Sequence, residues 1–163
     1  PEGLNDSKLL AAPRRAARCA ELREVAEVSV AHATVEEIDR INILAAAHLA
    51  MCRAIAGLAR PPDYALIDGN MIPKELPCAG QAVVKGDGLC LSIAAASIVA
   101  KTVRDRLMVD LAQQHPGYGW ETNAGYGSGA HMAALQNLGV TPHHRRSFKP
   151  VHNILYQDKT VSD

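Results

Sequence analysis

Residues 64–70 read Tyr-Ala-Leu-Ile-Asp-Gly-Asn, a short apolar run that ends in an acidic, glycine-containing turn. A run of this length followed by turn residues is typical of a buried β-strand. A second such run occupies residues 82–84, Ala-Val-Val, and is followed by Lys-Gly-Asp-Gly at 85–88. Two strands that end in this way can bring the carboxylates of Asp68 and Asp87 to one edge of a sheet.

Around these strands the hydrophobic spacing and the capping residues predict several helices and one further strand. Residues 24–33 alternate between apolar and polar side chains, which predicts a strand. The predicted helices are one that begins near Pro13, one long or two abutting helices over 38–59 after a capping box at Thr34–Glu37, and one over 91–114. A further helix is predicted to follow a cap at Ser128 and to run through Leu138. The alternation of strands and helices favours a three-layer α/β fold.

The chain has 163 residues, which predicts a single domain, with about 151–163 as a tail. Lys and Arg number 17, as do Asp and Glu, so overall charge does not favour nucleic-acid binding and any such site must be a local patch. No apolar run reaches the roughly 18 residues needed to cross a membrane. The four cysteines show no metal-ligand spacing and are interpreted as free thiols in a reducing cytosol.

Asp68 and Asp87 are the strongest candidates for chemistry. Carboxylates at strand ends are natural ligands for hard cations such as Mg²⁺ or Mn²⁺, and the glycines beside them allow a ligand to approach closely. The alternative is that both are ordinary turn residues, because Asp-Gly is a common turn pair.

Basic and aromatic residues form a second group of candidates. Lys101 and its neighbours on the predicted helix, and the basic stretch 143–146, carry groups that contact phosphates, although each taken alone is more often a solvated surface. Tyr126 lies between two glycines, where it can stack on a base or sugar, or can simply order its loop.

Two other chemistries are excluded. The seven histidines form no metal-site pattern, so we interpret His143 and His144 as a phosphate-side or surface pair rather than as zinc ligands. Ser92 and Ser97 have no identifiable partnered base, which argues against a nucleophilic serine.

Eight short motifs, in order along the chain, resemble the bacterial ribonuclease HII pattern. They are Gly3-Leu4-Asn5-Asp6-Ser7-Lys8, Val35–Leu44, Ile67-Asp68-Gly69-Asn70, Val84-Lys85-Gly86-Asp87, Ala94–Lys101, Arg104-Asp105-Arg106, Gly125-Tyr126-Gly127 and His144-Arg145-Arg146-Ser147-Phe148. Each motif alone is weak, but eight in register are very specific, and they cover the chain from Gly3 to about Val151.

The resemblance implies a ribonuclease H-like three-layer fold, with a mixed central sheet flanked by helices and a C-terminal helical part. It implies an endonuclease that cuts RNA in RNA–DNA hybrids and ribonucleotides embedded in duplex DNA. The family's two divalent metal ions, Mn²⁺ or Mg²⁺, support in-line displacement that leaves a 5′-phosphate and a 3′-hydroxyl. A monomer in the cytoplasm is expected.

The resemblance also assigns roles to individual residues. Asp68 and Asp87 are similar to the third and fourth metal-binding carboxylates, and Tyr126 to a tyrosine that stacks near the ribose–deoxyribose junction. The residues similar to those near the substrate are Asn5, Ser7, Lys8, Lys85, Lys101, Arg145 and Arg146.

Two departures from the family pattern matter. The opening strand, with its Asp-Glu-Ala-Gly-Arg-Gly motif and the first two carboxylates, does not occur in this chain. We therefore expect the 163 residues alone to be inactive and an upstream segment to precede Pro1; a catalytically inactive nucleic-acid-binding fragment is the alternative. A small-molecule metallophosphatase would fit the two aspartates but not Tyr126 or the basic stretch. The second departure is Ala124, where many relatives carry a lysine.

Overall fold

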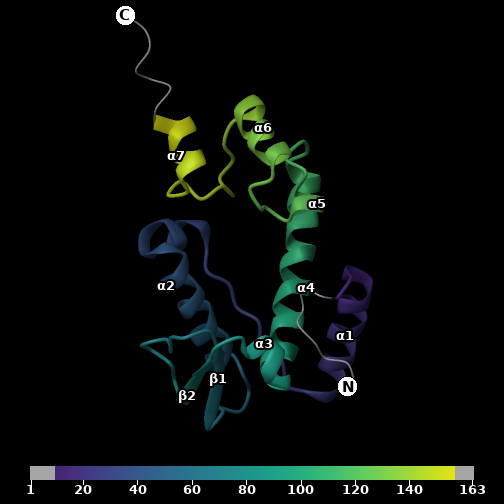
Figure 1. The fold of residues 1–163 in the computed structure, drawn as a ribbon, viewed down its shortest axis with the longest axis vertical. Coiled ribbons are helices and arrows are strands. Elements are labelled where there is room, and N and C mark those ends of the chain that lie inside the picture. The colour runs from purple at the N-terminus through teal and green to yellow at the C-terminus, as the bar shows by residue number, and fades with distance from the viewer. Residues whose placement is uncertain (1–9, 157–163) are drawn as a thin grey trace, which may run out of the picture. The chain divides into compact units, whose positions relative to one another are not determined.

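The computed structural model describes residues 10–156, which fold into two compact units. The first unit contains the described residues up to His32 together with Ala47–Val103, and the second contains Ala33–Ala46 and the residues from Arg104 onward. Figure 1 shows the elements along the chain, and the helices α2 and α4 each contribute to both units.

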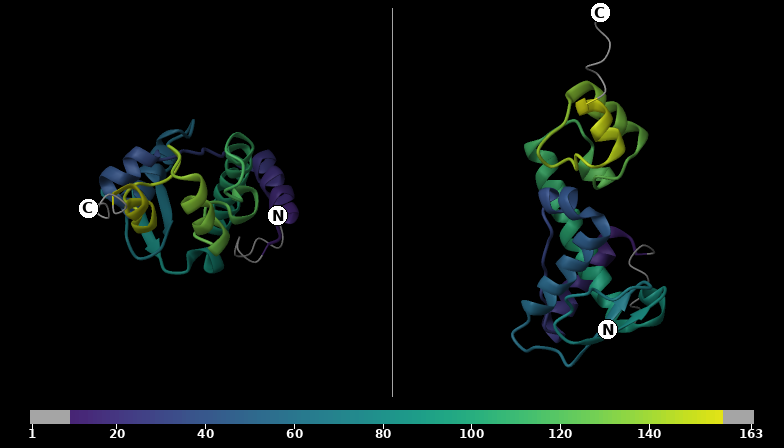
Figure 2. Two further views of the ribbon diagram at one scale, coloured as in Figure 1. Left: turned by 90° about the horizontal axis from the view of Figure 1, so that it is seen from above. Right: turned by 90° about the vertical axis from the view of Figure 1, so that its left-hand side faces the viewer.

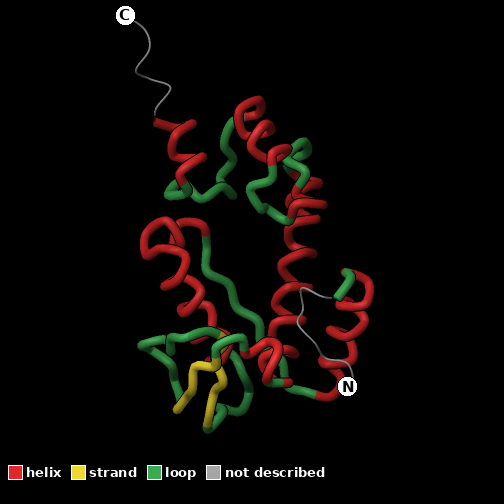
Figure 3. The backbone as a smooth tube through the Cα atoms, viewed as in Figure 1, coloured by secondary structure: helices red, strands yellow, loops and turns green. Residues whose placement is uncertain are grey.

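The sheet of the first unit consists of two parallel strands among the described residues, β1 (Tyr64–Asp68) and β2 (Ala79–Val83). Both strands were predicted, although β2 begins three residues earlier than the apolar run that signals it. In the register Asp68 lies opposite Val83, so both strands end at the same edge of the sheet. Figure 3 shows how small this sheet is beside the helices.

Two helices form the core of the first unit. Helix α1 (Ala12–Val25) begins with Pro13 in its first turn, as predicted, and α4 spans Leu91–Gln114. Cys19 and Leu22 of α1 pack with Ile98 and Val99 of α4, and Ile98 is fully buried. Figures 1 and 2 show α1 running beside the first part of α4.

The strand predicted over 24–33 is wrong. Helix α1 extends to Val25, and the residues that follow, up to Thr34, belong to no regular element. Their backbone begins extended, with Ala26 at φ −138° and ψ 150°. An extended segment becomes a strand only by pairing, and within residues 10–156 neither β1 nor β2 pairs with it.

Helix α2 (Val35–Ala56) is two abutting helices that meet at Asn42, one of the two arrangements predicted. Thr34 and Glu37 form the predicted capping box, in which each side chain accepts from the other residue's amide. Asn42 has φ 69°, which breaks the first helix, and its side-chain oxygen accepts from the amides of Leu44 and Ala45. Asn42 therefore caps the second helix, and its φ of 69° with ψ of 167° lies in a strained region that glycine adopts far more readily than other residues.

Replacing Asn42 with alanine should lower the free energy of unfolding by about 1–2 kcal/mol, because it removes the oxygen that caps the second helix and leaves the strain of the positive φ in place. Asn42→Gly should cost clearly less, since glycine adopts this conformation without strain. Thermal and urea unfolding of the two variants measure the difference. Equal losses for alanine and glycine would contradict the role of the backbone conformation.

The second unit is helical. After α4 come α5 (Trp120–Asn123), α6 (Gly129–Leu138) and α7 (Lys149–Tyr156), and the hydroxyl of Ser128 caps α6 as predicted. Leu135 of α6 and Val151 of α7 are fully buried in its core, and α7 lies beside α6 in Figure 2. The regular structure therefore reaches Tyr156, beyond the expected start of a tail at about 151.

Helices long and apolar enough for a membrane crossing are absent from residues 10–156.

Candidate functional site

Asp68 and Asp87 lie near the shared end of the two parallel strands. Asp68 is the last residue of β1, and its Oδ1 accepts a hydrogen bond of 2.8 Å from the amide of Gly86, the residue before Asp87. Asp87 itself lies in the first turn of α3 (Gly86–Leu89), which follows β2 directly. Asp68 is exposed and Asp87 is half-buried, so both residues at this edge of the sheet are at least partly accessible to solvent.

The approach of Asp68 to α3 depends on the absence of a side chain at Gly86. A Cβ at Gly86 would collide with Cδ1 of Ile93 and would lie 3.3 Å from Oδ1 of Asp68. Ile93 is itself buried, which leaves it little room to turn away. Lys85, at φ 56°, supplies the left-handed residue that turns the chain from β2 into α3, and its side chain is exposed two residues before Asp87 in the chain.

The chemical type of the ligands available at this edge of the sheet suits a hard divalent cation. Carboxylate oxygens are the ligands that Mg²⁺ and Mn²⁺ prefer, and Asp68 and Asp87 offer them on adjoining segments. Residues 10–156 contain no group of three or more His, Cys, Asp or Glu side chains arranged to hold a metal ion. Within the described residues the candidate metal site therefore rests on these two aspartates.

Lys101 belongs to the same unit and lies on α4, half-buried. Ile93, on the same helix, contacts the turn at Gly86. Lys101 lies eight residues after Ile93, which corresponds to about 12 Å along the helix axis. The sequence placed Lys101 among the substrate-binding candidates, and the structure puts it on the helix that packs against the turn holding Asp87.

Tyr126 lies in the second unit, on the loop between α5 and α6, and its side chain is 62% exposed. Arg104 of α4 approaches this loop twice: its guanidinium donates to the carbonyl oxygen of Ala124 at 2.8 Å and lies 5.7 Å from the ring centroid of Tyr126. Asn123 accepts from the amide of Gly125, which has φ 78°. An exposed aromatic ring on an ordered loop suits stacking on a base or sugar.

Arg145 and Arg146 also lie in the second unit, just before α7. The guanidinium of Arg145 lies 5.2 Å from the ring centroid of Phe148, and the Arg146 side chain is exposed. The amides of Arg146 and Ser147 donate to the carboxylate of Asp39, more than 100 residues earlier in the chain. The basic stretch is therefore anchored to α2.

The interpretation of His144 as a surface or phosphate-side residue is wrong, because its ring is only 6% exposed. The ring lies 5.0 Å from that of Tyr118 and 5.1 Å from that of Trp120, and its Nδ1 accepts from the amide of Thr141 at 3.0 Å. Burial lowers the pKa of His144 to about 4, with a further contribution from the nearby His131. His144 is thus a neutral core residue, while His143 is exposed.

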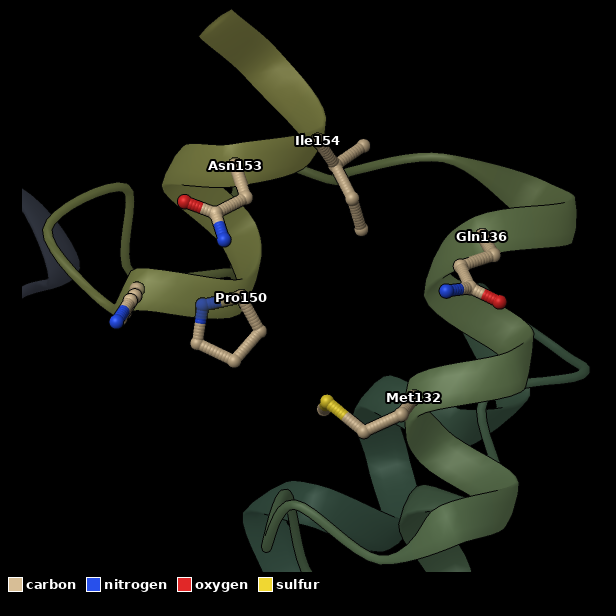
Figure 4. Close-up of a pocket in the computed structure, with 6 residues that line it drawn as sticks. Met132, Gln136, Pro150, Asn153 and Ile154 are labelled. Carbon is tan, nitrogen blue, oxygen red and sulfur yellow. The ribbon is translucent and has the colours of Figure 1, made fainter. Parts of the chain in front are cut away.

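A hollow of about 330 Å³ lies between α6 and α7, as Figure 4 shows. Met132 and Gln136 line it from α6, and Pro150, Asn153 and Ile154 line it from α7 together with Lys149. Its lining contains none of the carboxylates or aromatic side chains considered above, and it offers no group suited to phosphodiester hydrolysis.

The remaining candidates from the sequence, Asn5, Ser7 and Lys8, lie outside the described residues.

Sequence reasoning assigned no individual role to Asp39 or Asn42, and treated Arg104 only as part of a basic helix face. Asp39 and Asn42 both occur in the Val35–Leu44 motif, and Arg104 opens another of the matching motifs. An asparagine between the charged first turns and the apolar remainder of this helical stretch, as Asn42 is, was a usable signal of a helix break. The partners of Asp39 and Arg104 were not readable, because each lies 20 or more residues away.

Two solved structures share this fold. The crystal structure of ribonuclease H2 from Pyrococcus horikoshii OT3 matches with a TM-score of 0.76 and 22% identity, over 97% of this chain and 82% of that chain. The ribonuclease HII of Archaeoglobus fulgidus, solved in complex with PCNA, matches with a TM-score of 0.66, over 93% of this chain and 80% of that chain. The fold is therefore that of the ribonuclease H-like α/β proteins, as predicted.

Sequence relationships identify the family. Residues 2–151 match the family model described as ribonuclease HII. A ribonuclease HII from Cereibacter sphaeroides is 74% identical over 162 residues, which cover 99% of this chain and 76% of that relative. One from Roseobacter denitrificans is 65% identical, over 99% of this chain and 81% of the relative. The chain belongs to the ribonuclease HII family, and the predicted enzyme class, a type 2 ribonuclease H, is confirmed.

Proposed function

We propose that this protein is an endonuclease that hydrolyses RNA in RNA–DNA hybrids and at ribonucleotides embedded in duplex DNA, leaving 5′-phosphate and 3′-hydroxyl ends, and that it takes part in removing such ribonucleotides. Family membership supports the ribonuclease H activity. The observation that carries the site assignment is the pair Asp68 and Asp87 at one end of two parallel strands, linked through the amide of Gly86.

In this proposal Asp68 and Asp87 hold divalent cations, Mn²⁺ or Mg²⁺, together with further carboxylates of the family's site. Bound cations supply Lewis-acid activation of water and stabilise the leaving oxygen. The hydrogen bond from Gly86 fixes Oδ1 of Asp68, which orients the carboxylate before any ion arrives. Lys85 adds positive charge beside this edge, where a phosphate would lie.

The other proposed contacts bind the substrate backbone and recognise the ribonucleotide. Lys101, Arg145 and Arg146 neutralise backbone phosphates, and Asn5, Ser7 and Lys8 are proposed substrate contacts at the start of the chain. Tyr126 stacks at the junction between ribose and deoxyribose, where the 2′-hydroxyl distinguishes RNA from DNA. We further propose that the protein acts as a monomer in the cytoplasm, where its four free cysteines would stay reduced.

The direct test is incubation of the protein, in a form that also carries the first two carboxylates of the family's site, with Mn²⁺ or Mg²⁺ and a DNA duplex that contains one ribonucleotide. We expect one cut on the 5′ side of the ribonucleotide, with a 5′-phosphate and a 3′-hydroxyl at the nick, and no cut in an all-DNA duplex. Binding without any cut in either metal would instead support a nucleic-acid-binding protein. Failure to bind duplex at low salt would favour a small-molecule hydrolase.

Tyr126→Ala should reduce cleavage at a single ribonucleotide by roughly 10- to 100-fold, the scale on which removal of a base-stacking ring acts. Tyr126→Phe keeps the ring and should retain most of the activity. Because the ring is exposed, neither variant should change the melting temperature by more than a few degrees. Single-turnover cleavage measures the effect. If Tyr126→Ala cleaved as fast as Tyr126→Phe, the proposed stacking role of Tyr126 would be wrong.

A further inference from the structure

The carboxylate of Asp39 holds the segment that carries Arg145 and Arg146. Its Oδ2 accepts from the Arg146 amide at 2.9 Å, and its Oδ1 accepts from the Ser147 amide at 2.9 Å and from the Ser147 hydroxyl at 2.6 Å. Both oxygens are thus engaged by two consecutive residues that lie 107 and 108 positions away. All of these residues belong to the second unit.

Asp39 is held in its charged form at this position. Partial burial acts to raise the pKa of Asp39, but the hydrogen bonds from Ser147 and Arg146 and the positive charge of Arg145 outweigh it and lower the pKa overall. Charged acceptors make roughly twice as strong a hydrogen bond as neutral ones. The contact is therefore suited to fixing a backbone conformation rather than to weak surface pairing.

The two arginines are used differently. Arg145 lies over the ring of Phe148 and contributes to the charged state of Asp39, so its guanidinium is directed toward the protein's own groups. Arg146 is exposed, and its amide, not its side chain, makes the contact with Asp39. Fixing the amide fixes the point from which the Arg146 guanidinium reaches into solvent.

We propose that Asp39 is a positioning residue for substrate binding, which orders residues 145–147 so that the exposed guanidinium of Arg146 meets a backbone phosphate of the duplex. This inference rests on the proposed function, in which the basic stretch contacts nucleic acid. Within the basic stretch it concerns the phosphate contact of Arg146, whose amide is anchored; the Ser147 amide and hydroxyl complete the anchor, and the charge of Arg145 helps to keep Asp39 ionised.

The direction in which Asp39→Asn changes duplex affinity distinguishes a positioning role of Asp39 from a purely electrostatic one. Asp39→Asn removes a negative charge close to a surface that binds a polyanion, so electrostatics alone predicts tighter duplex binding. Asparagine has only one oxygen that can accept, so it loses part of the anchor, and the mobile Arg146 must then be ordered on binding. Ordering a side chain costs about 0.5–1.5 kcal/mol, which corresponds to roughly two- to tenfold weaker binding.

The experiment measures binding of a labelled duplex with one ribonucleotide, in EDTA so that no cleavage occurs, to the intact protein and its variants. We expect Asp39→Asn to bind roughly two- to tenfold more weakly. Glu36→Gln is the matched control, because it removes the same charge from the same short helix at an exposed position without contacting residues 145–147. It should bind as the wild type does or slightly more tightly.

A double-mutant cycle with Arg146→Ala tests whether Asp39 acts through Arg146. Arg146→Ala alone should weaken binding and reduce the slope of log affinity against log salt by about one. Adding Asp39→Asn to Arg146→Ala should then weaken binding no further, because the loss caused by Asp39→Asn acts through Arg146. Hydrogen exchange by NMR should show faster exchange of the Arg146 and Ser147 amides in Asp39→Asn, with the rest of the second unit unchanged.

Tighter or unchanged binding by Asp39→Asn, independent effects in the cycle, or unchanged exchange at the two amides would overturn the inference. These results are distinct from failure of the proposed function, which would appear as a wild-type protein that neither binds nor cuts the ribonucleotide-containing duplex.

Discussion

Asp68→Asn is expected to reduce cleavage of a ribonucleotide-containing duplex by more than about 100-fold, since loss of a group that merely supports a metal ligand already costs roughly 10- to 100-fold. The asparagine oxygen can still accept from the Gly86 amide, so the end of β1 and the start of α3 should keep their structure. The variant should also bind duplex in EDTA as the wild type does. Single-turnover cleavage in Mn²⁺ and melting curves measure the two properties.

Asp63→Asn provides the matched control. Asp63 is an exposed residue immediately before β1, at the opposite end of the strand from Asp68. Its replacement removes the same charge from the same strand and should leave cleavage within about twofold of the wild type, as expected for an exposed site away from the chemistry. If Asp68→Asn cleaved as well as Asp63→Asn, the carboxylate pair would not be the metal site and the mechanism proposed above would fail.

Acid should destabilise the second unit through His144. The pKa of the buried ring is lowered from its ordinary 6.5 to about 4, first by burial and then by its neighbour His131. Because the folded-state pKa lies below the unfolded value, the contribution of the neutral ring is fully present above about pH 6.5 and is lost as the pH falls towards 4. The loss amounts to about 3 kcal/mol of unfolding free energy across this range.

Urea unfolding followed by the fluorescence of Trp120, the single tryptophan, measures this loss, because its ring lies 5.1 Å from that of His144. His144→Asn keeps an acceptor for the Thr141 amide but cannot titrate, so its stability should vary less between pH 6.5 and 4 even though the smaller side chain lowers stability overall. His143→Gln, at the exposed neighbour, should keep the wild-type dependence. An unchanged dependence in His144→Asn would assign the acid sensitivity to other groups.

Local signals in the sequence predicted those parts of the fold that local interactions determine. Helix α4 has the predicted bounds because its ends are marked by a change of composition and by Pro116-Gly117, and α6 begins at the predicted Ser128 cap. The strand expected over 24–33 failed because the alternation of side chains specifies an extended backbone but not a pairing partner. Helix α7 was missed because only eight residues form it and its burial depends on α6.

In the candidate site, too, the features that local sequence determines could be predicted, and those that depend on distant partners could not. The position of Asp68 and Asp87 near one edge of the sheet could be predicted because each follows a buried strand, and the two strands end at the same edge. The partners of Asp39 and Arg104 could not, since a carboxylate or guanidinium carries no local mark of the distant amide or carbonyl that it binds. His144 was misjudged because a histidine beside arginines resembles a surface residue until the rings of Tyr118 and Trp120 are seen to enclose it.

The turn at Gly86 places a constraint on how this protein can diverge. A larger residue there would need the space that Cδ1 of Ile93 fills, and would press on the oxygen of Asp68 that the turn itself anchors. Among descendants of this sequence, a larger residue at position 86 should therefore be accompanied by a smaller side chain at position 93.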